Sequence, residues 1–135
     1  MPPNPTDSVP TAPPAKPAAP RILSVGQCGS DDSRLARLLG ELGLRLERAP
    51  DAATATELLN TGHYALVLVN RIFDADGSSG LALIAQLGAT VPVMLISDYP
   101  EAQAQAVAAG ALAGFGKSQL QDPRTREKLR KAVRT

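Results

Sequence analysis

The sequence of 135 residues has few of the side chains on which many functions depend: one cysteine, one histidine, no tryptophan, two tyrosines and two phenylalanines. A single cysteine excludes an internal disulfide framework and a cysteine-rich zinc site, and a single histidine argues against other metal centres. The scarcity of aromatic rings argues against a surface that stacks nucleic-acid bases. Any function must therefore depend on other residue types.

An excess of charge and a long apolar run are also missing. The formal net charge is +1, which does not point to nucleic acid or to an acidic substrate. No apolar run approaches the ~18 residues of a membrane-spanning helix, and residues 1–20 lack the apolar core of a secretion signal. We therefore expect a cytoplasmic protein with no membrane partner and no nucleic-acid partner.

Proline is concentrated at the N-terminus, where eight of the twelve prolines fall within residues 1–20. This segment has too little apolar surface to offset the entropy cost of ordering the chain. We predict a disordered Pro/Ala-rich tail over residues 1–20, which we interpret as a linker, and one domain over residues 21–135.

From residue 21 onward, short apolar runs alternate with segments of helical periodicity. The pattern predicts strands at 22–25, 44–47, 64–69, 91–96 and 112–116. It predicts helices at 31–44, 51–60, 81–87 and 101–109, and a last helix with Asp122 as its cap and Pro123 in its first position. Phe73 and Phe115 are expected in the core or lining a pocket. Five such βα units predict an α/β fold with a parallel sheet covered on both faces.

Ligands of such open sheets bind beyond the carboxyl ends of the strands. The predicted strand tips there carry Gly26 with Gln27, Asn70, Ser97 and Lys117. In order and spacing, the segments 64–70, 80–84, 91–97 and 110–117 resemble the receiver domain of bacterial response regulators. The resemblance covers residues 21 to about 133. It implies a flavodoxin-like (βα)5 doubly wound parallel sheet with strand order 2-1-3-4-5.

In receiver domains, an acidic pair after the first strand and an aspartate after the third strand bind Mg²⁺, and that aspartate accepts the phosphoryl group. A hydroxyl residue and a lysine bind the phosphoryl oxygens. The resemblance places Ser97 and Lys117 at these last two positions, but Gly26 and Gln27 at the acidic pair and Asn70 at the phosphoacceptor. Mg²⁺ is usually bound through carboxylates, and an amide is not a comparable nucleophile. We therefore expect a pseudo-receiver that has lost Mg²⁺ binding, needs no cofactor and is not an enzyme.

Two other positions depart from the receiver pattern. Gly114 stands where receivers usually carry an aromatic switch residue, and Ser118 replaces the proline that follows the lysine. Without a carboxylate at position 70, the Lys117 ammonium needs a different partner. The candidates are Asp74, Asp76 and Asp98.

Acidic residues also follow the first strand. Asp31 or Asp32 could rebuild an ion site, with Asp74 as a further candidate, if the loops folded toward one another. We favour the alternative that Asp31 and Asp32 are capping residues at the positive end of a helix.

A different enzyme class has to be considered because Cys28 and Arg34 match the Cys-x5-Arg pattern of protein tyrosine phosphatases. That chemistry needs a thiolate and backbone amides around a phosphate dianion. Asp31 and Asp32 inside the loop would repel both the thiolate and the substrate. An inert cysteine is the preferred interpretation, and a phosphatase is the minor alternative.

Small residues on the fourth helix and basic residues on the last helix are candidates for an interaction surface. They are Ala102, Ala106, Ala109, Arg124, Lys128 and Lys131. The resemblance implies a place in two-component (phosphorelay) signal transduction. We predict a receiver-like module that is not phosphorylated and acts through contact with a signalling protein or with a second copy of itself. The alternative is a pocket that binds another anion or ion through Ser97 and Lys117.

Overall fold

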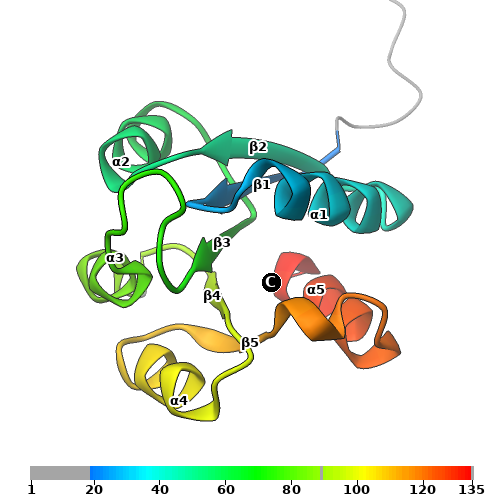
Figure 1. Ribbon diagram of the computed structural model, residues 1–135. Helices are drawn as coiled ribbons and strands as arrows, with labels where there is room; N and C mark the ends of the chain where they lie inside the picture. Colours follow the sequence, from blue (N-terminus) through cyan, green and yellow to red (C-terminus); the bar gives the residue numbers. More distant parts are fainter. Residues whose placement is uncertain (1–18, 89, 135) are drawn as a thin grey trace, which may run out of the picture.

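The computed structural model describes residues 19–88 and 90–134. Its strands form one parallel sheet in the order β2-β1-β3-β4-β5, with helices on both faces (Figure 1). The strands are β1 (Arg21–Val25), β2 (Arg45–Ala49), β3 (Leu66–Asn70), β4 (Val93–Ile96) and β5 (Leu112–Phe115). The predicted fold class and strand order are confirmed. The predicted tail falls almost entirely on residues 1–18, which lie outside the described part of the chain.

Five α-helices and one short 3₁₀ helix connect or follow the strands. They are α1 (Gly29–Glu41), α2 (Ala52–Thr61), α3 (Gly80–Leu87), α4 (Pro100–Ala108), η2 (Lys117–Gln119) and α5 (Pro123–Arg134). Helices α1 and α5 cover one face of the sheet, and α2, α3 and α4 cover the other (Figure 1). Among the described residues, no helix has the length and apolarity to cross a bilayer.

The core consists of two apolar layers separated by the sheet. In β3, Leu66 and Leu68 pack toward α1 and α5, whereas Val67 and Val69 pack toward the other three helices. All five residues of β3 are buried, as is typical of a central parallel strand covered on both faces. This layering places the end of β3, and therefore Asn70, at the centre of the carboxyl edge of the sheet.

Local capping explains where several helices begin. The Asp51 carboxylate accepts a hydrogen bond from the Thr54 amide (2.8 Å) at the start of α2. Asp122 accepts one from the Arg124 amide (2.9 Å), as predicted for the last helix. Pro123 takes the first position of that helix. At these positions the sequence signal is local, so the helix starts were predictable.

Helix α1 is different, because Cys28 is its N-cap residue and makes no side-chain cap. The helix begins at Gly29, so that Asp31 and Asp32 lie inside its first turn. Both aspartates lie at the positive end of the helix, as expected, but the prediction that they cap it is wrong, because their buried carboxylates bond to other side chains.

Candidate functional site

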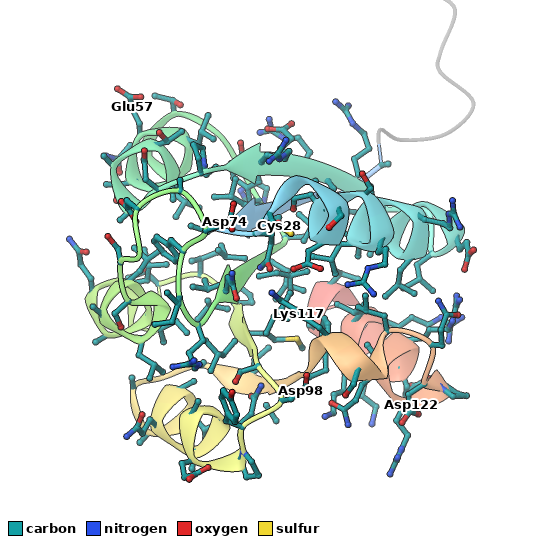
Figure 2. The ribbon with its side chains drawn as sticks, viewed as in Figure 1. Cys28, Glu57, Asp74, Asp98, Lys117 and Asp122 are labelled. Atoms are coloured by element: carbon teal, nitrogen blue, oxygen red, sulfur yellow. The ribbon has the colours of Figure 1, made fainter. Side chains whose placement is uncertain are left out.

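A pocket of about 590 Å³ opens at the carboxyl ends of the strands. Figure 2 shows Cys28, Asp74 and Lys117 around it, on the segments that follow β1, β3 and β5. Asn70 and Ser97 also line this pocket, so three of the predicted strand-tip positions meet in one place. Gly26 and Gln27 are not among the residues that line it.

Asn70 acts as a hydrogen-bond donor in the structure. Its Nδ2 donates to the Gly26 carbonyl oxygen at 3.0 Å, and only 8% of the residue is exposed. The same carbonyl accepts a second hydrogen bond from the backbone amide of Asp74 (2.9 Å). The Asn70 amide therefore connects the end of β3 to the end of β1, a contact that a carboxylate could not make while ionised.

The space above Gly26 is filled by an aromatic ring. Gly26 has a φ of 79°, and a Cβ added to it would lie 2.2 Å from Cδ1 of Phe73. Phe73 is 1% exposed, so the prediction that it lies in the core is confirmed, as it is for Phe115. Only glycine is tolerated at position 26, because the backbone is left-handed and the ring takes the place of any side chain. The side chain of an acidic residue does not fit there.

Gln27, at the second position of the acidic pair, offers no replacement for a carboxylate. The residue is 4% exposed, and neither its Oε1 nor its Nε2 has a hydrogen-bond partner among the described residues. A neutral amide at this depth gives an ion much less attraction than a carboxylate. The residues at the two acidic-pair positions, Gly26 and Gln27, therefore do not fit Mg²⁺.

The segment between β3 and α3 folds into a small hairpin that carries Phe73 to this position. Ile72 and Ser79 form an isolated antiparallel bridge. Within the turn, the Phe73 amide donates to the Ser78 carbonyl (2.9 Å). Sequence analysis predicted that Phe73 is buried, but its contact with Gly26 depends on this hairpin and could not be predicted.

Lys117 forms an ion pair with Asp31, between Nζ and Oδ2 at 2.6 Å. The prediction that Asp74, Asp76 or Asp98 neutralises the lysine is therefore wrong. Asp98 instead accepts a hydrogen bond from the Ser118 hydroxyl (2.6 Å). Asp31 reaches Lys117 because α1 begins two residues before the predicted start, which puts the carboxylate on its first turn.

The Asp31 carboxylate is held in its charged form. Burial by itself would raise its pKa, but hydrogen bonds from Lys117, Arg34 and Cys28 outweigh that effect and lower the pKa from 3.8 to about 2. Asp31 also lies in the first turn of α1, where the helix dipole favours an anion. The pocket therefore contains a permanent negative charge at neutral pH, supplied by α1 and not by β3.

Asp32 is turned away from the pocket. It accepts a hydrogen bond from the Ser24 hydroxyl of β1 (2.6 Å) and forms an ion pair with Arg48. Asp31 thus bonds toward η2, whereas Asp32 bonds toward β1 and β2. No group of three or more His, Cys, Asp or Glu side chains suited to a metal ion occurs in the described part of the chain. Asp31 and Asp74 line the pocket, whereas Asp32 is bonded away from it.

The Ser97 side chain lines the pocket. Its Oγ accepts a hydrogen bond from the Tyr99 amide (3.1 Å), which leaves the hydroxyl proton free to be donated. At the rim, the Arg71 guanidinium stacks on the Tyr99 ring at 4.8 Å from its centroid. Tyr99 and Ile72 are 57% and 42% exposed, so the pocket has an apolar rim above a polar floor.

The segment from Cys28 to Arg34 is the start of α1 and not a phosphate-binding loop. Cys28 is half-buried, with its Sγ 3.4 Å from the Ser30 hydroxyl oxygen. Arg34 donates a hydrogen bond to Asp31 (2.6 Å). The arginine that a phosphatase would use to bind a phosphate is therefore already paired with a carboxylate.

The structure corrects the predicted interaction surface on α4. Ala102 and Ala106 are 6% and 0% exposed, and Ala109 is partly buried against the same core. These residues form the inner stripe of the helix, where small side chains allow close packing on the sheet. The composition of α4 revealed its small residues but not which side they face.

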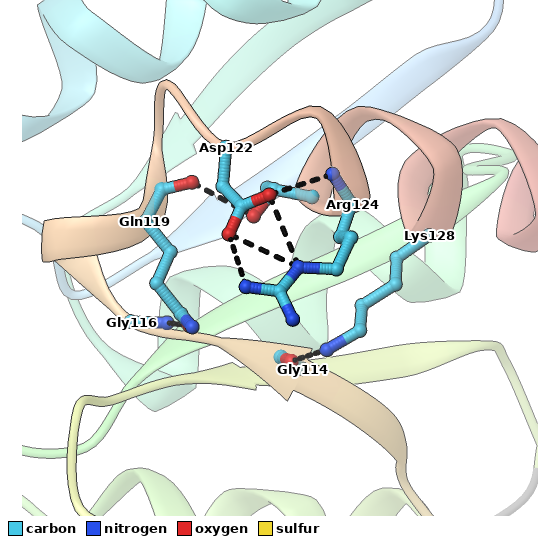
Figure 3. Close-up of polar contacts among 7 residues, drawn as sticks. Gly114, Gly116, Gln119, Asp122, Arg124 and Lys128 are labelled. Atoms are coloured by element: carbon cyan, nitrogen blue, oxygen red, sulfur yellow. Dashed lines mark hydrogen bonds and ion pairs between the residues drawn. The ribbon is translucent and has the colours of Figure 1, made fainter.

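The basic residues predicted on α5 are only partly free. Arg124 forms an ion pair with Asp122 (2.9 Å), and Lys128 donates to the Gly114 carbonyl (2.8 Å) (Figure 3). Lys131 is exposed. The predicted basic face is therefore less available to a partner than its sequence indicates.

A second pocket, of about 820 Å³, lies between α4, β5 and α5. Its lining includes Ala104, Val107, Ala108 and Ala113, which are all exposed. Val107 is 48% exposed, and Leu112 on β5 is 42% exposed. Sequence analysis placed a candidate interaction surface on the fourth and last helices but did not predict an apolar groove between them. Val107 was the available signal, since it is the large apolar residue on the side of α4 opposite the alanine stripe.

Gly114 helps to form the groove because it lies in an irregular part of β5. The register between β4 and β5 shifts between Met94 and Ile96, and a Cβ on Gly114 would lie 2.1 Å from the Leu95 carbonyl oxygen. Gln103 satisfies the backbone groups there: its Oε1 accepts from the Gly114 amide (3.1 Å), and its Nε2 donates to the Leu95 carbonyl (2.9 Å). Gly114, at the position where an aromatic residue was expected from the resemblance, is thus held by Gln103 of α4 and Lys128 of α5.

No protein-family model matches the sequence, and no curated protein matches it. Solved structures do resemble it. The signal receiver domain of an HD domain-containing protein from Pseudomonas fluorescens Pf-5 aligns with a TM-score of 0.72 and 24% identity, covering 92% of this chain and 93% of that one. A Francisella response regulator receiver domain aligns at 0.66 and 19%, covering 85% and 97%. A CheY-like receiver domain from Methylobacillus flagellatus aligns at 0.65 and 19%, covering 85% and 98%. The chain therefore has the fold of response regulator receiver domains.

Proposed function

We propose that this chain is a receiver-like module that is not phosphorylated and that acts by protein–protein contact in two-component signal transduction. The receiver fold supports the pathway. The chemistry of the pocket supports the loss of phosphorylation, and the exposed apolar groove supports a role in binding proteins.

The observation that carries the proposal is the hydrogen bond from Asn70 Nδ2 to the Gly26 carbonyl (3.0 Å). An unmodified receiver would need a nucleophilic carboxylate at position 70, and here the amide is engaged as a donor. Phe73 fills the space above Gly26, and Lys117 already has an anionic partner in Asp31. The nucleophile, the ion site and the free cation are all replaced by internal contacts.

Titration of the full chain with Mg²⁺ and then with beryllofluoride, followed by amide NMR, tests this part of the proposal. We expect no saturable shifts at Asn70, Ser97 and Lys117, because no metal site is available to complete a phosphoryl-like complex. Saturable shifts at these three residues would overturn the proposal. Incubation with acetyl phosphate, followed by mass spectrometry, gives an independent measurement, and a phosphorylated species would also contradict it.

The groove between α4 and β5 is the surface we propose for the partner, which is either another signalling protein or a second copy of this chain. Replacing Val107 by Asp would place a charge at its apolar rim, whereas Gln105→Asp changes an exposed polar position of the same helix. Self-association through the groove would appear as concentration-dependent sedimentation that Val107→Asp abolishes and Gln105→Asp preserves. A concentration-independent monomer would direct the search to a different signalling protein.

A further inference from the structure

We propose that residues 8–15 of the N-terminal segment bind, within the same molecule, to a third pocket at the amino ends of the strands. This pocket has a volume of about 510 Å³ and lies between the end of α2, the segment that enters β3 and the segment from α3 to β4. It is therefore at the opposite edge of the sheet from the pocket that contains Asn70. The inference does not depend on the proposed function, which concerns that carboxyl edge and the groove beside α4.

The lining of the third pocket suits a neutral, proline-rich chain. Its apolar part consists of four half-buried side chains, Leu59, Leu87, Val91 and Pro92. Among the described residues, no Asp, Glu, Lys or Arg lines it, whereas charged residues line both pockets described above. A charged side chain would lose hydration there without gaining an ion pair. The pocket therefore favours an uncharged ligand.

Two polar side chains at the rim supply hydrogen-bond donors. Asn60 and His63 line the pocket, are exposed, and have no side-chain hydrogen-bond partner within the part of the chain that the structure describes. A polyproline II chain makes no internal hydrogen bonds, so its carbonyl oxygens remain available as acceptors. The Asn60 amide can donate to such a carbonyl, as can one nitrogen of a neutral His63 ring. The pocket thus offers apolar surface for proline rings and donors for the backbone between them.

The composition of residues 8–15 matches this lining. They read Ser-Val-Pro-Thr-Ala-Pro-Pro-Ala, with three prolines and no charged side chain, and they lie between Asp7 and Lys16. Proline restricts φ, so this segment loses less conformational entropy on binding than an ordinary chain does. By itself the segment has too little apolar surface to become ordered, and the pocket supplies the missing contacts.

The place where the chain enters the domain brings the segment close to the pocket. Arg21, the first residue of β1, donates to the His63 carbonyl (3.1 Å), and its guanidinium stacks on the Tyr64 ring at 4.6 Å from the centroid. Both of these partners line the pocket. Residues 16–20, which separate the segment from Arg21, span about 15 Å when extended. A tether of this length gives an effective concentration of about millimolar, so a weak interaction is enough to fill the pocket.

The test measures paramagnetic broadening of amide NMR signals in the full chain. Because Cys28 is the one cysteine, Cys28→Ser combined with Thr6→Cys gives a single site for a nitroxide label just ahead of the segment. Tethering alone brings the label near the amino edge, so the decisive comparison is between two substitutions at the end of α2. Asn60→Arg puts a long side chain at the rim of the pocket. Thr61→Arg adds the same charge at the next position, which is exposed and does not line the pocket.

We expect the label to reduce the amide signals of His63 and Thr90 by about half or more in the labelled chain and in its Thr61→Arg variant. Asn60→Arg should restore most of this intensity, because its side chain occupies the space of the segment. Equal broadening in the two arginine variants would overturn the proposal. Broadening of unlabelled chains by labelled chains mixed with them would also overturn it, because the bound segment would then come from a second copy.

The prolines give an independent check. Changing the three prolines of residues 8–15 to glycine should reduce the broadening to the level of Asn60→Arg, because the restricted backbone and the rings are both lost. The matched control changes the three prolines of residues 1–7 to glycine and should leave the broadening in place. A similar loss in both sets would mean that general stiffness of the chain, and not a bound segment, positions the label, and would refute the proposal.

Discussion

Replacing Asn70 by Asp restores the residue type that a phosphorylated receiver would carry, yet we expect it to destabilise this chain. The Asn70 amide donates to the Gly26 carbonyl at 3.0 Å in a site that is 8% exposed. An ionised carboxylate has no proton to donate, so two oxygen acceptors would face each other at that distance. Gly26 cannot move away easily, because its carbonyl also accepts from the Asp74 amide and the Phe73 ring packs against its backbone.

The size of the effect follows from these interactions. Loss of the hydrogen bond costs about 1 kcal/mol, and burial of an imperfectly paired acceptor adds about 1–3 kcal/mol. Lys117 offsets only part of this cost because Asp31 already neutralises it. We expect the free energy of unfolding at pH 7.5 to fall by about 2–4 kcal/mol, a large fraction of the stability of a small domain.

The effect should depend on pH in a definite direction. Burial beside a carbonyl raises the pKa of the new carboxyl group in the folded state above its unfolded value. The folded state then binds more protons than the unfolded state, so the penalty is largest above the folded pKa and shrinks as the pH falls. Once protonated, the group can donate to the Gly26 carbonyl as the amide does. The substitution should therefore be much less harmful at pH 4 than at pH 7.5.

Urea unfolding of the full chain at both pH values, with and without Mg²⁺, measures this difference. Asn60→Asp makes the same chemical change at an exposed position of α2 and should cost only a few tenths of a kcal/mol. The reasoning would be refuted if Asn70→Asp were as stable as the unsubstituted chain at pH 7.5, or if Mg²⁺ raised its stability. A stabilising effect of Mg²⁺ would mean that the pocket can still assemble an ion site.

Four other predictions concern single residues. Gly80→Ala should lower the free energy of unfolding by about 2–3 kcal/mol, because its Cβ would lie 1.9 Å from the Asn70 carbonyl oxygen. Gly40→Ala in α1 should raise the free energy of unfolding by about 0.5–1 kcal/mol, because its Cβ meets nothing within 4 Å. Equal effects of Gly80→Ala and Gly40→Ala in urea unfolding would contradict both estimates. Gln103→Ala removes hydrogen bonds to several backbone groups at the β4–β5 irregularity and should cost about 2–3 kcal/mol, with faster amide exchange confined to β5. Asp31→Asn should cost about 1–2 kcal/mol at pH 7, and in acid unfolding the two chains should converge as the pH falls from 3.8 toward 2, because the stabilisation requires the ionised carboxylate. Parallel acid-unfolding curves would show that Asp31 contributes nothing through its charge.

The strand-tip residues could be predicted because their positions follow from local patterns. Apolar runs mark the parallel strands, and the carboxyl ends of such strands meet at one edge. Asn70, Ser97 and Lys117 therefore line one pocket, as expected from sequence. Asp31 was correctly noticed but wrongly interpreted as a cap. Its ion pair with Lys117 depends on where α1 begins and on how the first turn of α1 meets the segment that follows β5, and neither is encoded in the neighbouring residues.

The wrong prediction on α4 and the unpredicted contact at Gly26 have a common physical origin. A helix rich in alanine has little contrast between its faces, so the sequence could not show that Ala102 and Ala106 face the sheet. At Gly26, the sequence revealed that an acidic residue was absent but not that the Phe73 ring had taken its space. Both features arise from tertiary packing, which short-range periodicity does not determine.

The hydrogen bond from Lys128 to Gly114 also bears on how the edge of the sheet is protected. β5 is one border of the sheet, and such borders can recruit strands from other molecules into aggregates. Here the Gly114 carbonyl is occupied by an ammonium group (2.8 Å), and the irregular register interrupts the regular ladder that an incoming strand would need. A partner can therefore approach this border through side chains but is hindered from adding a strand. Lys128, which lines the groove, thus also hinders the amyloid-like addition of strands to β5.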